Sequence, residues 1–345
     1  MRRGRALRFA RAVLLGALVV PTAPAQTPPD EFRPVRAQVE EFIRYMERTH
    51  GFDARELHRI FSRLKPSEGV QRAISAPSTA KPWHEFRSLF VDQARVENGA
   101  RFWDAHAELL GRARADFGVP EAIIVSIVGI ETRYGRVTGG FRVVDALHTL
   151  AFEGQNRPDF FRQELEHFLL LAREQRWDPL AVSGSYAGAM GMPQFMPSSY
   201  RRYAIDYSGD GGVDLWRDPA DVIGSVASYL RQFGWKDGDP VVAPVRVDTA
   251  ETQALLELGI KPSLTVEQWR MRGVEPMGET APALTAALFR FDLLGGSEYW
   301  LGFDNFYAIL QYNRSRNYAM AVHDLAREIV RERERLAAVN GAEQQ

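Results

Sequence analysis

The chain has 345 residues, of which 45% are hydrophobic, 11% aromatic and 25% charged. Such a composition is typical of a globular protein with a sizeable core, so it excludes a wholly disordered chain and a collagen-like repeat. Cysteine is absent, which excludes disulfides, thiolate metal sites, a cysteine nucleophile and a lipid-bearing cysteine. The formal net charge of −1 gives no indication of a nucleic-acid partner.

Residues 1–25 are expected to be an export signal. Five arginines precede an apolar run from Ala12 to Val20, and Ala23-Pro24-Ala25 supplies small residues for cleavage. The run is too short to span a bilayer as a mature helix. Cleavage near Ala25 would remove five arginines and no acid, changing the net charge from −1 to −6. We therefore predict a periplasmic protein that is not a lipoprotein; a basic helix of the mature fold is the alternative.

Helical periodicity dominates the rest of the chain. The predicted helical segments cover, in chain order, residues 35–46, 53–64, 83–117 (one or two helices), 122–130, 160–172, 219–233 and 318–339. The fourth of these is apolar almost all round, so we expect it to be buried. Strand patterns are confined to residues from about 240 to 295. The sequence thus predicts a mainly helical α+β protein with a small β insertion and, in the mature chain, no membrane span.

Glu131 is the first candidate for chemistry. It follows the apolar segment 122–130 and precedes Thr132-Arg133-Tyr134-Gly135, which is expected to turn the chain. A carboxyl group at the mouth of an apolar helix is desolvated, which raises its pKa. A glycosidic oxygen leaves poorly unless it is protonated, so a neutral carboxylic acid near pH 7 suits that reaction. The alternative is a helix-end glutamate paired with Arg133 or another arginine.

The segment from Gly184 to Pro197 is the second candidate, because it is rich in glycine, alanine and methionine. Small residues let the backbone approach a ligand closely. Ser185, Tyr186 and Gln194 offer a hydroxyl, an aromatic ring and an amide, which suit a sugar with N-acetyl groups. A tight helix–helix crossing with methionine as filler is the alternative.

The third candidate is the segment from Tyr312 to Tyr318. Its aromatic rings can stack on pyranose rings, and the amide of Asn313 can bond to sugar hydroxyls. The alternative is a polar loop before the last helix. Motifs of zinc hydrolases, nucleotide-binding P-loops and GxSxG hydrolases are absent from the sequence.

The fourth candidate, residues 206–218, matches the first half of an EF-hand loop. Acids or a hydroxyl occupy positions 1, 3 and 5, and glycine occupies the turn at position 6. Position 12, normally a bidentate glutamate, is Arg217, and the late Asp218 is also the natural N-cap of the next helix. We expect a weak structural Ca²⁺ site or a metal-free turn, and no cofactor required for chemistry. The candidate ligands are Asp206, Ser208, Asp210, Gly212 and Asp218.

Together these segments resemble the lytic murein transglycosylase B family, from about residue 35 to residue 329. GIETRYGR around Glu131, GSYAGAMG and QFMPSSY within 184–200, DYSGDG at 206–211 and YNRSRNYAMAV at 312–322 occur in family order. The resemblance implies that Glu131 is the sole catalytic acid/base. It also implies that the site is lined by Ser185, Gln194, Tyr229, Tyr312, Asn313 and Tyr318.

The sequence departs from the family pattern at two places that bear on substrate contact. Pro193 stands where the family often has glycine, and Arg157 is the one arginine in 155–158, where some members have a pair. We keep Arg157 and Tyr186 among the expected substrate contacts.

The resemblance also implies an architecture and a reaction. The architecture is a lysozyme-like helical core with an additional helical domain and a small β domain. We expect an N-terminal helical region at 26–118, the catalytic core at 119–238, the β region at 239–295, and a last part of the core at 296–340 that completes the groove.

The reaction implied is cleavage of the MurNAc–GlcNAc β-1,4 bond of peptidoglycan with a 1,6-anhydromuramic acid product. Glycosidases normally use two carboxylates, but one suffices if the C6 hydroxyl of muramic acid attacks its own C1. The alternatives are a muramidase that hydrolyses the same bond with water and a non-catalytic peptidoglycan-binding protein. The expected partner is the glycan strand, bound by a monomer.

Overall fold

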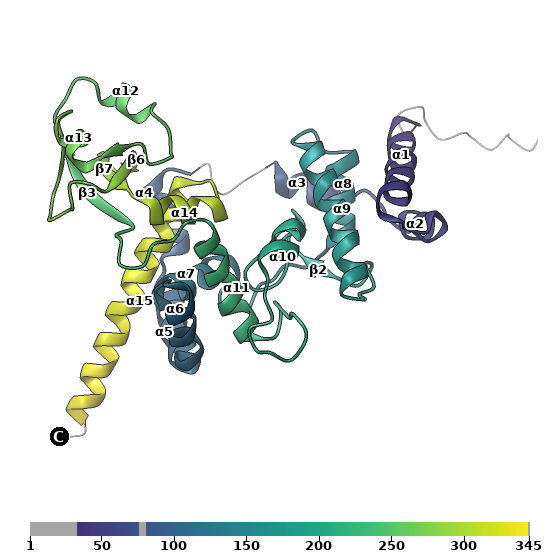
Figure 1. Cartoon of the computed structure of the whole chain (residues 1–345), viewed down its shortest axis with the longest axis horizontal. Coiled ribbons are helices and arrows are strands. Elements are labelled where there is room, and N and C mark those ends of the chain that lie inside the picture. The colour runs from purple at the N-terminus through teal and green to yellow at the C-terminus, as the bar shows by residue number, and fades with distance from the viewer. Residues whose placement is uncertain (1–32, 76–80, 344–345) are drawn as a thin grey trace, which may run out of the picture.

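A computed structural model describes residues 33–75 and 81–343 of the chain (Figure 1). The predicted export signal at 1–25 lies outside the described residues. The helices are α1 (Arg33–His50), α2 (Ala54–Phe61), α3 (Glu68–Ile74), α4 (Trp83–Phe90), α5 (Gln93–Ala105), α6 (Ala107–Phe117), α7 (Glu121–Thr132), α8 (Val143–Phe152), α9 (Pro158–Glu174), α10 (Pro197–Tyr203), α11 (Pro219–Gln232), α12 (Thr252–Leu256), α13 (Val266–Arg270), α14 (Asp304–Tyr312) and α15 (Arg316–Glu343). The strands are β1 (Phe141–Arg142), β2 (Ser183–Gly184), β3 (Val242–Val247), β4 (Leu264–Thr265), β5 (Val274–Pro276), β6 (Thr285–Leu293) and β7 (Gly296–Gly302).

Helix α7 lies at the centre of the helical core. Every residue from Ala122 to Ile130 is buried, because apolar side chains cover the whole circumference of the helix. Helices α5, α6, α11 and α15 pack around it. The predicted buried helix is confirmed, and it ends one residue beyond Glu131.

The N-terminal helices form a separate group at the other side of the molecule. Helix α1 packs on α2 and α8, α3 packs on α8, and α8 packs on α9; Figure 1 shows this group opposite the sheet. The predicted boundary at residue 118 places α5 and α6 with α1–α3, but both helices pack against α7. Residues 83–117, predicted to form one or two helices, form three, α4, α5 and α6.

The β region is one antiparallel five-stranded sheet in the order β4-β6-β7-β3-β5. In the hairpin of β6 and β7, Leu288 lies opposite Leu301 and Phe289 opposite Trp300. Trp269 of α13 is buried against Leu288 and Leu301 in a second hydrophobic core. The insertion is therefore confirmed, but the predicted limit at 295 divides the hairpin, since β7 runs from 296 to 302.

The prediction that strands are confined to about 240–295 is wrong for β1 and β2. These two-residue strands pair antiparallel, with Phe141 opposite Gly184 and Arg142 opposite Ser183. The pairing ties the start of the glycine-rich segment to the chain that leaves α7. Within the described residues, no helix is both long and apolar enough to cross a membrane. The fold class, a mainly helical core with extra helices and a small β insertion, is confirmed.

Candidate active site

Glu131 lies in the last turn of α7, where the chain turns sharply. Arg133 and Tyr134 both have left-handed backbone conformations, with φ of 51° and 61°, which cost roughly 1–3 kcal/mol each and persist where the surroundings impose them. The Tyr134 hydroxyl donates a 2.8 Å hydrogen bond to the carbonyl of Arg95. A Cβ on Gly129 would clash with that hydroxyl oxygen. Gly129 therefore lets Tyr134 fold back onto α7, and the helix stops with Glu131 at its mouth.

The carboxyl of Glu131 is held by Tyr318, which lies 187 positions later in the chain on α15. The Tyr318 hydroxyl donates a 2.6 Å hydrogen bond to Oε1 of Glu131. Burial raises the pKa of Glu131 to about 7, and the bond from Tyr318 opposes this rise. The hydrogen-bond partner of this carboxyl is thus a tyrosine of α15, where the alternative interpretation expected an arginine.

Three tyrosines form a continuous aromatic group beside this carboxyl. The ring of Tyr318 stacks on Tyr312 at 6.4 Å and 12°, and Tyr229 of α11 meets Tyr312 edge-on at 4.8 Å. The hydroxyl of Tyr312 donates to the carbonyl of Pro193 at 2.5 Å, and that of Tyr229 to the carbonyl of Gln311 at 2.6 Å. Burial raises the pKa of Tyr312 and of Tyr318 well above the ordinary value. Both phenols are therefore protonated donors near neutral pH.

The segment from Gly184 to Met196 is a compact loop between β2 and α10, so the alternative of a helix–helix crossing is contradicted. Ser185 Oγ accepts hydrogen bonds from the amides of Ala187 (3.3 Å) and Ala189 (3.0 Å). Gln194, at φ 52°, donates from its side chain to the carbonyls of Thr138 (3.1 Å) and Gly191 (2.9 Å). The hydrogen bond to Glu131 thus comes from Tyr318, while Ser185 supports its own turn.

Sequence reasoning missed Thr132, which joins the turn after Glu131 to the loop that contains Met192. Its Oγ1 donates to the carbonyl of Met192 at 2.9 Å and accepts from the amide of Gly135 at 3.1 Å. The side chain is 1% exposed. In the sequence, only its position next to Glu131 could have indicated this role, because its partner, Met192, is 60 residues away.

Three expected substrate contacts lie outside this hydrogen-bonded cluster. Arg157 is exposed at the start of α9, and its guanidinium lies 3.9 Å from the Phe160 ring centroid. Tyr186 is half-buried and packs against the main hydrophobic core. Asn313 accepts a 3.1 Å hydrogen bond from the amide of Ser315 and lines a neighbouring pocket.

The loop at 206–218 is closed by protein hydrogen bonds. The carboxylate of Asp206 accepts from the amides of Gly209 (2.7 Å) and Gly211 (2.8 Å), which lowers its pKa. Asp221, 1% exposed on α11, accepts from the amides of Tyr207 and Asp214, each at 2.8 Å. Sequence reasoning missed Asp221, which joins the two ends of the loop.

The acids of the same loop are engaged mainly by the protein itself. Within residues 33–75 and 81–343, no three His, Asp or Glu side chains are grouped so that they could hold a metal ion. Asp218 caps α11 by accepting from the amide of Ala220 at 2.8 Å, as its position before Pro219 predicts. The hard oxygen donors of Asp206, Ser208 and Asp210 are of the kind that calcium prefers, and in this structure the Asp206 carboxylate is engaged by backbone amides.

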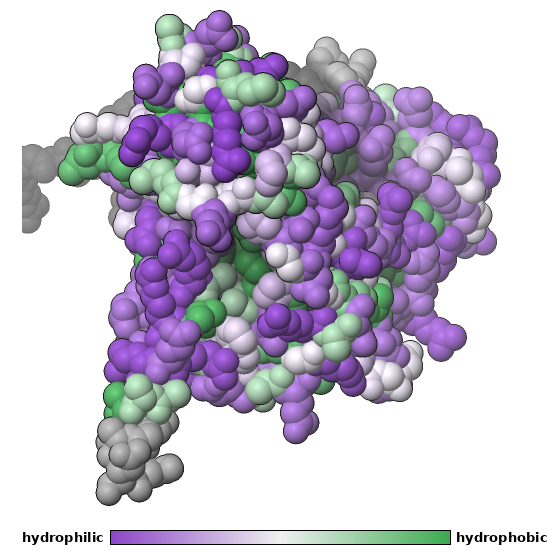
Figure 2. Space-filling view, turned by 60° about the vertical axis from the view of Figure 1, so that its left-hand side comes forward, coloured by the Kyte–Doolittle hydropathy of each residue, from purple (hydrophilic) through white to green (hydrophobic). Residues whose placement is uncertain are grey.

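One face of the molecule is hollowed. Figure 2 shows a mostly hydrophilic surface with a hollow between the β region and the helices, in which hydrophobic side chains are visible. Tyr229, Tyr312 and Tyr318 belong to the main hydrophobic core or pack against it. The cluster around Glu131 thus combines an apolar wall with a few convergent polar groups, as binding sites for small ligands do.

Comparisons with known proteins agree with this arrangement. A family model described as "Transglycosylase SLT domain" matches residues 34–327. The chain is 44% identical over 301 residues to "Membrane-bound lytic murein transglycosylase B" of Escherichia coli (strain K12), covering 84% of this chain and 82% of the relative.

Two solved structures are similar over most of their length. Soluble lytic transglycosylase SltB1 from Pseudomonas aeruginosa is 48% identical with a TM-score of 0.80, covering 86% of this chain and 99% of that one. Escherichia coli lytic transglycosylase Slt35, solved in complex with calcium, is 41% identical with a TM-score of 0.76, covering 86% and 93%. The chain therefore belongs to the transglycosylase SLT domain family and is a lytic murein transglycosylase, an enzyme that cleaves peptidoglycan.

Proposed function

We propose that this enzyme cleaves the β-1,4 bond between MurNAc and GlcNAc with Glu131 as its sole acid/base and leaves a 1,6-anhydromuramic acid end. The observation that carries the proposal is the carboxyl of Glu131 at the end of a buried helix, with a pKa raised by burial to about 7. Such a group is protonated in a large fraction of molecules near neutral pH, and it can both give and take a proton there.

The first step transfers the proton of Glu131 to the glycosidic oxygen. The bond from that oxygen to C1 of muramic acid breaks, and GlcNAc leaves with a free 4-hydroxyl. Glu131 is then a carboxylate, which the hydrogen bond from Tyr318 stabilises. The tyrosine hydroxyl bonds to Oε1, so we propose that Oε2 faces the scissile bond.

The second step closes a ring within the substrate. The C6 hydroxyl of muramic acid attacks C1 of the same sugar, and its proton passes to Glu131. The new bond joins O6 to C1, and the enzyme returns to its starting protonation state. This sequence needs one carboxyl group and no water.

The environment of Glu131 supports a single-acid mechanism over retaining hydrolysis with a second carboxylate beside it. A retaining glycosidase places its second carboxylate about 5–5.5 Å away, and a negative charge at that distance would raise the pKa of the first acid. In the described part of the chain, burial and Tyr318 are the influences that act on the pKa of Glu131, and no other carboxylate contributes. This favours the substrate's own hydroxyl as the nucleophile.

We also propose that Ser185, Gln194, Tyr229, Tyr312 and Asn313 contact the glycan strand. Tyr312 links α14 to the loop at 193, and the loop supplies Gln194 next to that contact. The aromatic group beside Glu131 offers ring faces on which a pyranose can stack. Arg157 and Tyr186 are proposed to contact more distant parts of the strand.

The structure of Slt35 in complex with calcium supports calcium binding by this chain, and the oxygen donors of Asp206, Ser208 and Asp210 make the loop at 206–218 our proposed site. The hydrogen bonds of Asp206 and Asp221 support a loop that folds without the ion. We propose weak calcium binding that adds stability and takes no part in the chemistry. Because murein lies outside the cytoplasm, we also propose that the protein is exported to the periplasm; its monomeric state and the absence of a lipid anchor stay predictions.

Digestion of purified peptidoglycan, followed by mass spectrometry of the fragments, tests the proposed reaction. The anhydro product is lighter by one water than the product of hydrolysis. We expect anhydro fragments to dominate. Fragments with a free reducing end would identify a muramidase, and intact peptidoglycan would identify a binding protein.

A further inference from the structure

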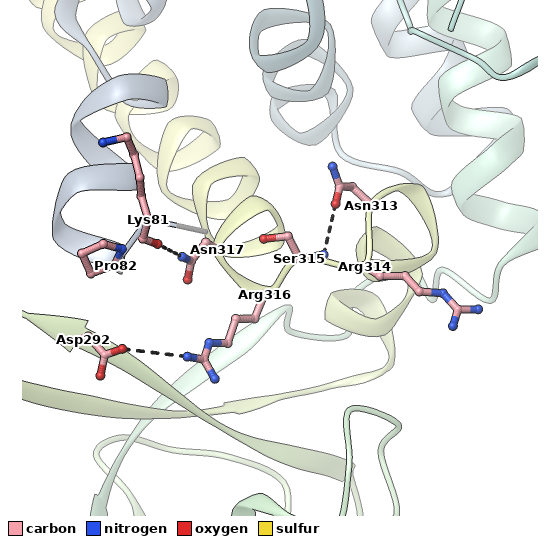
Figure 3. A pocket seen from close by; sticks show the side chains of 8 residues that line it. All are labelled: Lys81, Pro82, Asp292, Asn313, Arg314, Ser315, Arg316 and Asn317. Atoms are coloured by element: carbon pink, nitrogen blue, oxygen red, sulfur yellow. Dashed lines mark hydrogen bonds and ion pairs between the residues drawn. The ribbon is translucent and has the colours of Figure 1, made fainter. Parts of the chain in front are cut away.

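A polar pocket with a volume of about 640 Å³ adjoins the active site. It lies where the turn between α14 and α15 meets the start of α4 and the end of β6 (Figure 3). Arg314 and Arg316 line it together with one acid, Asp292, and the amides of Asn313 and Asn317. Glu131 does not line this pocket, so it is a separate feature from the proposed catalytic cluster.

Hydrogen bonds fix the position of the pocket relative to Glu131. Asn317, 8% exposed, donates to the carbonyl of Lys81 at 2.9 Å, which joins α15 to the start of α4. The amide of Tyr318 donates to Ser315 Oγ at 3.3 Å, and the Tyr318 hydroxyl bonds to Glu131. The arginine-bearing turn is thus held two to four residues from the tyrosine that contacts the carboxyl.

The two arginines of the turn are exposed and weakly compensated by acids. Arg316 lies 3.9 Å from a carboxylate oxygen of Asp292, which Arg290 also contacts at 3.2 Å. Among the described residues, no acid lies within ion-pair distance of Arg314, which is exposed and extends away from the other pocket residues in Figure 3. Lys81 is already paired with Glu85 at 2.9 Å. Two guanidinium groups are therefore available to an anion.

Arg314 follows Tyr312 and Asn313 in the chain, and its charge acts on the aromatic group of the active site. Its positive charge acts on the hydroxyl of Tyr229 and opposes the rise in pKa that burial causes there. A ligand that reaches from Arg316 to Arg314 would therefore run from the β region toward the tyrosines beside Glu131. The first turn of α15, a helix of 28 residues, adds the positive end of its dipole to the same place.

We propose that Arg314 and Arg316, whose side chains extend to opposite sides of the turn in Figure 3, each bind a carboxylate of the peptide stems that muramic acid carries. The inference rests on the proposed function, because it assumes a glycan strand bound across Glu131. The sugar rings of that strand are uncharged, whereas its peptide stems carry carboxylates. A guanidinium group forms two parallel hydrogen bonds with a carboxylate, a geometry that neither a hydroxyl nor an amide offers in the same way.

The test compares three soluble substrates: strands with peptide stems, strands freed of stems by an amidase, and strands whose stem carboxylates are converted to neutral amides. The ratio of kcat/KM for stem-bearing to stem-free strands measures stem recognition. In the double variant Arg314→Ala, Arg316→Ala we expect this ratio to fall about three- to tenfold, the range for partly exposed charged contacts. Arg44→Ala, which removes an exposed arginine from α1, should leave the ratio at its wild-type value.

The amidated strands separate charge from shape. The kcat/KM of wild-type enzyme on amidated strands should equal that of the double variant on natural strands. The kcat/KM of the double variant should not fall further when its strands are amidated. Equal losses on stem-bearing and stem-free strands, or a ratio that does not change, would overturn the proposal. Failure of the proposed function has a different signature, since wild-type enzyme would then release no anhydro product from stem-free strands. Circular dichroism and the melting temperature establish that each variant is folded.

Discussion

At the scale of single residues, the proposed chemistry depends on the protonation of one carboxyl group. Glu131→Gln is isosteric but cannot deliver a proton to the leaving oxygen. We expect turnover to fall by at least roughly 10²–10⁴ while the fold is kept. The matched control is Glu121→Gln at the other end of α7, where the glutamate pairs with Arg114 at 3.1 Å. Release of anhydro fragments measures the rate, and wild-type turnover by Glu131→Gln would refute its role.

The hydrogen bond from Tyr318 should set the pH at which Glu131 loses its proton. That bond favours the charged carboxylate and so holds its pKa below the value that burial alone would give. In Tyr318→Phe we therefore expect the limb of the pH–rate profile that reports Glu131 to move upward by about one pH unit. The maximal rate should also fall.

Tyr312→Phe is the control for this shift. Its hydroxyl bonds to the carbonyl of Pro193 rather than to Glu131, so its loss should leave the position of that limb unchanged even where the rate falls. A profile of Tyr318→Phe that coincides with wild type in position would mean that the hydrogen bond does not tune Glu131.

At the scale of elements, the sequence was most informative where a pattern is long or dense. An apolar circumference from Ala122 to Ile130 specifies a buried helix regardless of its partners. Strands β1 and β2 carry no such signal, because two residues each cannot display a period. The bond between Tyr318 and Glu131 joins positions 187 apart, and only the packing of α15 against α7 brings them together. The role of Asp221 also depends on the way α11 folds back on the loop.

Calcium should stabilise the loop at 206–218 without entering the chemistry. The exposed oxygens of Asp206, Ser208 and Asp210 suit calcium, but the residues do not form a complete site, so we expect a Kd on the order of 10⁻⁴–10⁻³ M. An ion that binds the native state alone raises stability by mass action. The melting temperature should therefore climb with millimolar calcium.

Asp210→Ala should abolish this climb, since Asp210 lies at the tip of the loop and its carboxylate is exposed. A chelator should leave turnover in place at low temperature. A melting curve of wild-type enzyme that does not respond to millimolar calcium would show that the loop is a metal-free turn. Loss of turnover with chelator at low temperature would contradict the separation of the ion from the chemistry.

At the scale of the whole molecule, the chain returns twice to build the site. Helix α7 supplies Glu131, the loop after β2 supplies the backbone around Gln194, and α14 and α15 supply Tyr312 and Tyr318 after the sheet has been inserted. The family motifs identified each of these segments in the sequence. The arrangement of these segments in space could not be predicted from the sequence, because it follows from helix packing between residues that are far apart in the chain. The domain boundaries stay predictions, and helices α5 and α6 contact α7 across the boundary predicted at residue 118.

The burial of Glu131 lowers the free energy of unfolding, and the size of this effect should depend on pH. The folded-state pKa is raised to about 7, so the folded protein holds a proton that the unfolded chain releases at lower pH. Stability from this group is complete below about pH 4.5 and is lost as pH rises to about 7. Glu131→Gln carries no such proton and should become more stable than wild type across that window, by about 1–3 kcal/mol above it.

Urea unfolding of both proteins between pH 4.5 and 8.5 measures the difference in the free energy of unfolding. Glu108→Gln on α6, where the side chain is exposed, controls for removal of a carboxyl that folding leaves in water; it should track wild type at every pH. The difference in the free energy of unfolding between Glu131→Gln and wild type should grow as pH rises from about 4.5 to about 7 and then stay constant. Below this range the carboxyl of Glu131 is protonated in both the folded and the unfolded protein, and above it the carboxyl is ionised in both, so stability depends on pH only between these values. A gap that is constant with pH would mean that burial does not raise the pKa of Glu131, and the proton needed for the first step would then have to come from another group.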